Sequence, residues 1–232
     1  MKTTAPSPLS TPRTNRRHAR HARRVWWWST RRLPVLKRAL DLALVLPALL
    51  LLAPLFALLA LAIKVHDRGP VLFWQDRVGL HGRLFRFPKF RSMCVNAEAI
   101  RTALEANNQH GSEGVTFKMK RDPRITPIGR LIRRASIDEL PQLWCVLRGQ
   151  MSLVGPRPPL PSEVARYSML QRQRLSVTPG LTCIWQVNGR SEIPFPQQVL
   201  MDIDYIQQRS LGTDVKLLAK TLPAVIRGRG AY

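Results

Sequence analysis

The stretch ALDLALVLPALLLLAPLFALLALAI, residues 39–63, decides how this chain is organised. Among its 25 residues Asp41 is the one ionisable side chain. As an ideal helix the stretch would extend about 37 Å, which exceeds the roughly 30 Å hydrocarbon core of a bilayer. It starts too far into the chain for a removable signal peptide and lacks a small-residue cleavage site. The sequence therefore predicts a membrane helix near the N-terminus.

Basic residues flank this stretch on both sides, at Lys37-Arg38 and at Lys64. Positive charge is favoured on the cytoplasmic side, so charge at both ends gives a simple crossing no clear orientation. Pro47 and Pro54 lie inside the stretch, and each removes a backbone hydrogen bond and can kink a helix. From the residues alone two geometries stay open: a single crossing, or a hairpin that enters and leaves the same leaflet.

The charge of the chain is strongly positive and unevenly distributed. The 232 residues hold 37 Lys or Arg against 14 Asp or Glu, for a formal net charge of +23. Residues 1–38 contain eleven of the basic residues and no acid. Residues 1–24 are also almost free of large apolar side chains, so we expect residues 1–34 to form a disordered basic tail. The charge indicates a polyanionic partner: nucleic acid, anionic lipid or a phosphorylated substrate.

The remainder of the chain, residues 67–232, predicts a mixed α/β domain that is mostly helical. Short apolar runs at 71–74 and 84–87 flank a glycine-containing turn and predict a β-hairpin. Helices are expected over 94–106, from Pro127 onward, and over 139–148, 161–176 and 196–209. The three cysteines lie far apart, which excludes a disulfide-rich secreted scaffold and a cysteine zinc ribbon.

Two adjacent acids, Asp138 and Glu139, lie in the block RRASIDELPQL, residues 133–143. Ser136 and Glu139 have the spacing of a capping box, but Pro141 would then fall too deep in the helix, so a start at Asp138 is the alternative. Either way the acids occupy a helix N-terminus, which favours ionised carboxylates and phosphates. With Arg133 on the preceding helix, the block predicts either a phosphate site or a capped helix with surface ion pairs.

Two later loops each hold an arginine in a backbone stiffened by Gly or Pro. The run GPRPP, residues 155–159, presents Arg157, and the run WQVNGR, residues 185–190, ends at Arg190. Such loops suit phosphate binding, although each one alone is a weak signal because Gly, Pro and Arg are common in surface turns.

Together and in this order, the motifs resemble the bacterial sugar transferase family, the monotopic polyprenyl-phosphate phosphoglycosyl transferases that begin polysaccharide or glycan assembly. The resemblance covers about residues 35–232, with motifs at residues 37–41, 69–75, 77–79, 89–93, 136–142, 151–158, 179–182 and 185–190. The chain departs from the family at Ala53-Pro54, where members commonly have Ser-Pro, and at Cys183, where many have glycine.

The resemblance implies transfer of a sugar-1-phosphate, expected to be a hexose-1-phosphate, from a UDP-sugar to undecaprenyl phosphate, with Mg2+ as cofactor. It assigns Asp138 and Glu139 to the catalytic pair. Asp138 would attack the β-phosphorus and form a phosphosugar-aspartyl intermediate with release of UMP. Glu139 would position the acceptor or share the Mg2+ with Asp138. Four basic residues, Lys89, Arg133, Arg157 and Arg190, would bind phosphate.

The resemblance also implies a re-entrant helix–break–helix over residues 35–66, with the break at Ala53 and Pro54. The catalytic domain would then lie on the cytoplasmic face of the bacterial inner membrane. Expected partners are the UDP-sugar, undecaprenyl phosphate and anionic membrane lipids, while the oligomeric state stays open. An alternative, motivated by the +23 charge, is a membrane-tethered nucleic-acid-binding or scaffolding protein. The folded part has no recognisable nucleic-acid-binding motif, so we expect no specific nucleic acid.

Overall fold

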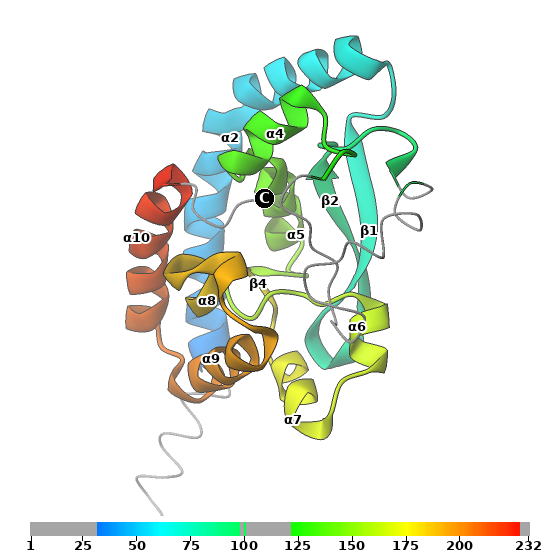
Figure 1. Ribbon diagram of the computed structural model, residues 1–232. Helices are drawn as coiled ribbons and strands as arrows, with labels where there is room; N and C mark the ends of the chain where they lie inside the picture. The colour runs from blue at the N-terminus through cyan, green and yellow to red at the C-terminus, as the bar shows by residue number, and fades with distance from the viewer. Residues whose placement is uncertain (1–31, 98–99, 101–121, 228–232) are drawn as a thin grey trace, which may run out of the picture.

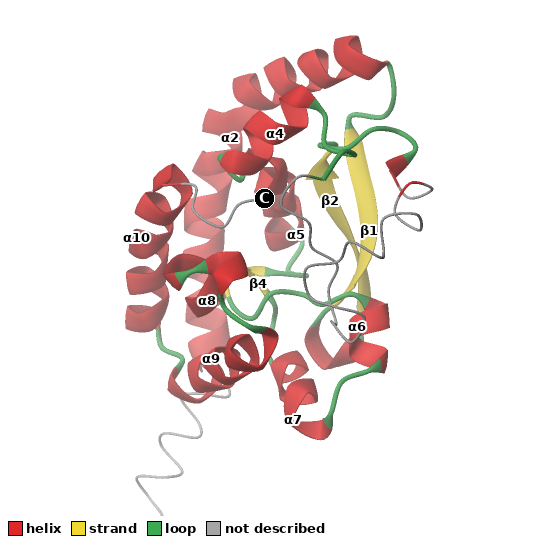
Figure 2. Ribbon diagram, viewed as in Figure 1, coloured by secondary structure: helices red, strands yellow, loops and turns green. Residues whose placement is uncertain are grey.

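The computed structural model describes residues 32–97, 100 and 122–227, so residues 1–31 of the expected tail and most of the helix expected over 94–106 lie outside the described residues. The last two residues of the expected tail, Leu33 and Pro34, are instead the first turn of a helix. In the described part helices pack with two small sheets, and the β1–β2 hairpin lies along one side of the molecule (Figure 1, Figure 2). The mostly helical α/β fold expected from the sequence is thereby confirmed. The first half contains α2 (Leu33–Asp67), β1 (Leu72–Val78), η2 (Leu80–Gly82), β2 (Leu84–Phe90), α4 (Pro127–Arg134), η4 (Ile137–Gln142) and α5 (Leu143–Leu147). The second contains β3 (Ser152–Val154), α6 (Pro161–Ala165), α7 (Met169–Arg172), η5 (Gln173–Ser176), β4 (Gly180–Thr182), α8 (Ile184–Asn188), η6 (Arg190–Glu192), α9 (Phe195–Gln208) and α10 (Leu211–Arg227).

The apolar stretch forms a single long helix, α2, that is apolar and long enough to cross a membrane. The helix continues through Pro47 and Pro54, and its axis turns part-way along its length (Figure 1). The expected helix–break–helix is therefore a bend within a continuous helix and not an interruption of it. The cause is local, because each proline removes one i→i−4 bond while the neighbouring turns keep theirs.

Both halves of α2 pack against the rest of the domain. Val45, in the first half, is fully buried in the main core with Val146 of α5. Ile63, in the second half, belongs to a smaller buried cluster with Phe90 of β2 and Ile132 of α4. The opposite face is bare, since Leu50 and Leu51 are 79% and 80% exposed. One face of α2 thus packs in the core of the domain, and the other exposes a large apolar surface that suits contact with lipid or another apolar partner.

The first turns of α2 are held by polar contacts with three other elements. Lys37 Nζ lies 2.5 Å from Asp214 Oδ2 on α10, and Arg38 donates to the carbonyls of Val146 and Leu147 at the end of α5. Asp41 accepts a 3.0 Å hydrogen bond from the backbone N–H of Leu153 in β3. The sequence motif at residues 37–41 therefore fastens α2 to the domain.

The predicted hairpin is present as β1 and β2, which pair antiparallel from Leu72 opposite Phe90 to Val78 opposite Leu84. Its strands are longer than the apolar runs in the sequence, because β1 continues through the polar residues Gln75, Asp76 and Arg77. Two of the predicted helices differ from the prediction. The helix expected over 139–148 is a 3-10 segment, η4, followed by the short α5, since Pro141 has no N–H for an α-helical bond.

Elsewhere the helical segments divide or extend beyond what the sequence predicted. The stretch 161–176 is three pieces, α6, α7 and η5, because Ser168 caps a new start by accepting from the N–H of Gln171. The helix expected over 196–209 is confirmed as α9. The final helix, α10, was not predicted and lies along α2 in Figure 1.

The second sheet consists of two short parallel strands, β3 and β4, with Ser152 opposite Gly180 and Val154 opposite Thr182. Gly180 lies so close to the neighbouring chain that an added Cβ would stand 2.0 Å from the backbone nitrogen of Gly155. Only glycine fits there. Because the strands are parallel, the segments that follow them leave from the same edge, which brings Arg157 and α8 together.

Candidate active site

Asp138 and Glu139 lie on η4, directly after a sharp change of direction between α4 and η4. Ser136, at this corner, has a left-handed backbone with φ of 55°, and its side chain makes no capping bond. The capping box at Ser136, one of the two alternatives that the sequence left open, is therefore not formed. The corner turns the two acids toward β2 and the loop after β3. A left-handed residue other than glycine is strained, and such strain is concentrated at functional sites.

Glu139 is held between two cations from different parts of the chain. Its Oε1 accepts from Lys89 Nζ of β2 and from Arg157 Nη2 of the loop after β3, both at 2.7 Å. Burial alone would raise the pKa of this carboxyl, but Arg157 and Lys89 outweigh it and hold the pKa well below its ordinary value. Glu139 is thus ionised across the physiological range and fixes both cations in place.

Asp138 has a different environment, although it is the adjacent residue. Its side chain is buried, and no group within residues 32–97, 100 and 122–227 forms a hydrogen bond or ion pair with its carboxylate. Burial raises its pKa, while the charges of Lys89 and Arg133 oppose that rise. Two neighbouring carboxyls with pKa values displaced in opposite directions are the pattern of a catalytic acid pair. Among the described residues, none binds the oxygens of Asp138.

The structure brings the four predicted phosphate-binding residues to this pair. Lys89 and Arg157 contact Glu139 directly, and burial lowers the pKa of Lys89. Arg133, in the last turn of α4, acts electrostatically on Asp138. Arg190 is half-buried, and its pKa is lowered by burial while Glu139 and Arg157 act on it from nearby. Six residues separated by up to 101 positions in the sequence therefore surround one site.

Arg77 is a structural component of the site that the sequence reasoning did not single out. Its Nη1 donates to the carbonyl of Pro158 at 3.0 Å, and its guanidinium stands over the ring of Phe87 with its carbon 5.2 Å from the centroid. Burial, with a smaller effect of Arg157, lowers its pKa to about 10. Arg77 supports the loop that carries Arg157. Its only signal in the sequence was its place in the motif at residues 77–79, which does not reveal a contact 81 residues away.

The acids can be tested for their fit to Mg2+. Among the described residues no three His, Cys, Asp or Glu side chains are grouped as a metal site. Mg2+ does not require such a cage, because it is commonly bound by one or two carboxylates together with water and substrate phosphates. The open oxygens of Asp138 fit that role. Glu139 fits it less well, since its Oε1 already accepts from two cations.

Comparison with known proteins places the chain among sugar transferases. A family model described as "Bacterial sugar transferase" matches residues 32–228. The galactosyl transferase CpsE of Streptococcus agalactiae is 46% identical over 198 residues, which are 85% of this chain and 43% of that protein. The undecaprenyl-phosphate galactose phosphotransferase of Salmonella typhimurium is 41% identical over 85% of this chain and 42% of its own length. The chain thus spans less than half of these two relatives.

A third relative is matched along most of its length. The exopolysaccharide production protein ExoY of Rhizobium meliloti is 38% identical over 198 residues, which are 84% of this chain and 88% of that protein. These likenesses do not favour the nucleic-acid-binding alternative. The family model covers the long apolar helix, the paired acids and the four basic residues alike, and this chain belongs to the bacterial sugar transferase family.

Proposed function

We propose that this protein transfers a hexose-1-phosphate from a UDP-sugar to undecaprenyl phosphate. The observation that carries the proposal is the contrast between the two acids: Asp138 is buried and its oxygens have no partner among the described residues, while Glu139 is held by Lys89 and Arg157. The names of relatives support the substrates. Besides the galactose enzyme above, the undecaprenyl-phosphate glucose phosphotransferase of Komagataeibacter xylinus is 42% identical over 84% of this chain.

In the first step a carboxylate oxygen of Asp138 attacks the β-phosphorus of the UDP-sugar. The bond from that phosphorus to the bridging oxygen breaks, and UMP leaves with the oxygen. The sugar phosphate stays on Asp138 as an acyl phosphate. In the second step an oxygen of undecaprenyl phosphate attacks the same phosphorus, the bond to Asp138 breaks, and the carboxylate is restored. Dividing one displacement between two anions into two steps is the advantage of a covalent nucleophile.

The basic residues offset the charge that these steps gather. Donor diphosphate, acceptor phosphate and the acid pair repel one another, and Lys89, Arg133 and Arg157 supply positive charge within the same site. Glu139 keeps Lys89 and Arg157 oriented toward the reacting phosphate. Mg2+ bound at Asp138 would add further charge neutralisation to the diphosphate. The loop support from Arg77 keeps Arg157 in this arrangement.

The proposal includes a re-entrant membrane helix, with the domain on the cytoplasmic face. Its support is the packing of α2: Val45 and Ile63, on opposite sides of the bend, are both buried against the domain, whereas Leu50 and Leu51 point away from it. A straight crossing would separate one of these halves from its core cluster. The Lys and Arg side chains within residues 1–31 would then meet the anionic inner leaflet. Each of these side chains contributes about 1 kcal/mol to membrane binding when it is close to the surface.

The function can be tested with the full chain in detergent, incubated with Mg2+, undecaprenyl phosphate and a series of UDP-sugars. Release of UMP that requires the wild-type Asp138 and yields lipid-linked sugar would support the proposal. No release from any UDP-sugar, or equal release by the Asp138→Asn variant, would overturn it.

A further inference from the structure

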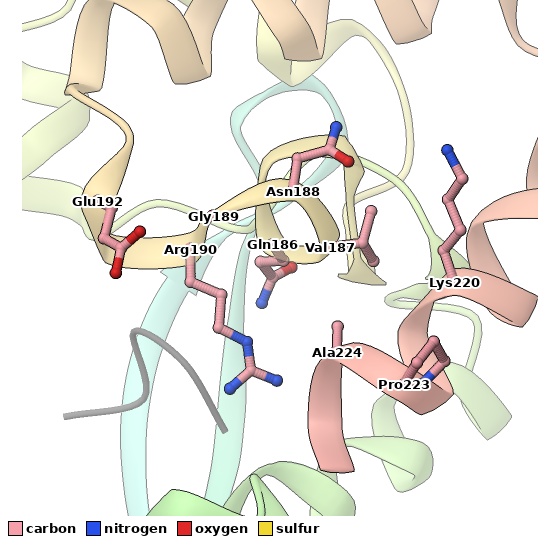
Figure 3. Close-up of a pocket in the computed structure, with 9 residues that line it drawn as sticks. All are labelled: Gln186, Val187, Asn188, Gly189, Arg190, Glu192, Lys220, Pro223 and Ala224. Carbon is pink, nitrogen blue, oxygen red and sulfur yellow. The ribbon is translucent and has the colours of Figure 1, made fainter. Parts of the chain in front are cut away.

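A pocket of about 300 Å³ opens between α8, η6 and α10 (Figure 3), and Arg190 in its lining lies within electrostatic range of Glu139. Its polar lining comprises Gln186, Asn188, Arg190, Glu192 and Lys220. None of the roles assigned above uses this space, although Arg190 belongs to both the pocket and the basic residues around Glu139.

The topology of the second sheet explains why Arg190, in the pocket lining, lies near Arg157 and Glu139. Because β3 and β4 are parallel, the loop with Arg157 and the helix α8 leave the sheet at the same edge. Arg157 binds Glu139 on one side, and Arg190, three residues past the first turn of α8, lies within electrostatic range of both. Arg190 therefore links the phosphate-binding side of the site to the pocket, and this link is the reason to ask which end of the donor the pocket holds.

Arg190 is built into the pocket with a strained backbone. Its φ is 52°, in the left-handed region that residues other than glycine rarely adopt. This conformation directs the side chain into the hollow between η6 and α10 (Figure 3). Strain of this kind persists where the surrounding structure imposes it, and it is frequent at ligand-binding positions.

Gln186 is oriented for binding by Cys183, which stands where many members of the family have glycine. The thiol of Cys183 donates to Gln186 Oε1 at 3.1 Å. Burial raises the pKa of the Cys183 thiol well above its ordinary value, so the thiol keeps its proton and remains a donor. With the oxygen satisfied, the two N–H groups of Gln186 are directed at the pocket (Figure 3).

Resting on the proposed function, we propose that this pocket binds the hexose of the UDP-sugar and determines which hexose is accepted. A carboxamide pair, a carboxylate and two cations offer donors and acceptors in the mixture that sugar hydroxyls require. The described residues that line the pocket include no aromatic ring on which uracil could stack. The volume stands at the lower end of the range for small-molecule sites, which suits one monosaccharide and not a whole nucleotide.

The test compares binding of UDP-glucose, UDP-galactose and UMP to the full chain in the Asp138→Asn background, where the donor is not consumed. Gln186→Leu and Lys220→Met remove pocket groups with little change in volume. Loss of a hydrogen bond that the pocket makes to the hexose should weaken binding of at least one UDP-sugar about tenfold and change the glucose-to-galactose preference. Affinity for UMP should stay within about twofold, because UMP carries no hexose.

Matched controls make the same two kinds of substitution, Gln to Leu and Lys to Met, at residues outside the pocket. Gln197→Leu on α9 and Lys216→Met on α10 alter exposed side chains that do not line it, and both should leave all three affinities unchanged. Equal weakening of UMP and the UDP-sugars by the pocket variants would mean that the nucleotide occupies the pocket and would overturn the inference alone. Unchanged affinities would do the same. Failure of the parent protein to bind any UDP-sugar would overturn the proposed function together with the inference.

Discussion

Glu139 Oε1 lies 2.7 Å from Lys89 Nζ. This ion pair joins η4, which carries Glu139, to β2, which carries Lys89. Arg157 reaches the same oxygen at the same distance from a third part of the chain. One carboxylate oxygen of Glu139 thus fixes two cations, whereas the oxygens of the buried Asp138 have no partner among the described residues. This division of environments between adjacent acids determines what Glu139→Gln and a change of pH should do to the reaction.

Glu139→Gln should impair both stability and turnover. Lys89 and Arg157, partly buried, would lose their common counter-charge, which should destabilise the fold by about 2–3 kcal/mol. UMP release should fall about a hundredfold because the cations are no longer held toward the phosphate. Thermal unfolding and UMP assays on the same preparation measure the two effects. Asp204→Asn, which neutralises an exposed acid on α9, is the control and should change neither.

The pH dependence of the first step should reveal the raised pKa of Asp138. Burial favours the protonated form, so the nucleophile is lost as pH falls through a pKa above the ordinary aspartate value of about 4. The pKa of Glu139 is displaced downward, so this carboxyl should stay ionised over the pH range in which Asp138 takes up its proton. The acid limb of UMP release, measured with UDP-sugar and no acceptor, should therefore lie above pH 4. An acid limb below that value would contradict the assignment of the two environments.

Gly180→Ala should separate the parallel strands. The new Cβ would stand 2.0 Å from the nitrogen of Gly155, so the backbone must move, at a cost of about 3 kcal/mol or more. For a chain of this size we expect the midpoint of thermal unfolding to fall by about 6–12 °C. Gly212→Ala on α10 is the matched control, because its Cβ would have open space, with Ser210 Oγ 3.8 Å away. That variant should be as stable as the wild type, and equal losses in both would refute the steric explanation.

Topology reporters should place both ends of the chain on one side of the membrane. A tag before Arg13 and another after Tyr232 are both expected to report the cytoplasm, because the two halves of α2 pack on a single domain. Reporters on opposite sides would mean that α2 is a true crossing. A variant with the tags exchanged between the ends controls for effects of the tags themselves.

The sequence predicted those features that depend on composition and local pattern. The apolar helix, the hairpin and the helix over 196–209 follow from hydrophobic periodicity and turn residues, and the structure contains all three. The resemblance supplied the residues of the site, which the fold brings together. The details that failed depend on single residues in context: Pro141 changes the helix type, and Ser136 turns the chain instead of capping it.

Contacts between distant residues could not be predicted from pattern. Arg77 is one basic residue among 37, and its role depends on the carbonyl of Pro158, which only the folded chain brings near. The opposite displacement of the Asp138 and Glu139 pKa values likewise depends on which carboxylate meets Lys89 and Arg157. Adjacent acids look equivalent in a sequence and acquire different chemistry through packing.

The central claim is that Asp138 becomes covalently attached to the sugar phosphate. The most direct measurement is the intact mass of the protein after rapid quenching with Mg2+ and UDP-sugar in the absence of undecaprenyl phosphate, followed by mapping of the modified peptide. We predict a mass increase of one sugar phosphate on the peptide that contains Asp138, with about one UMP released per protein. UMP release that requires the acceptor and leaves the protein unmodified, or a sugar phosphate on a different residue, would contradict it.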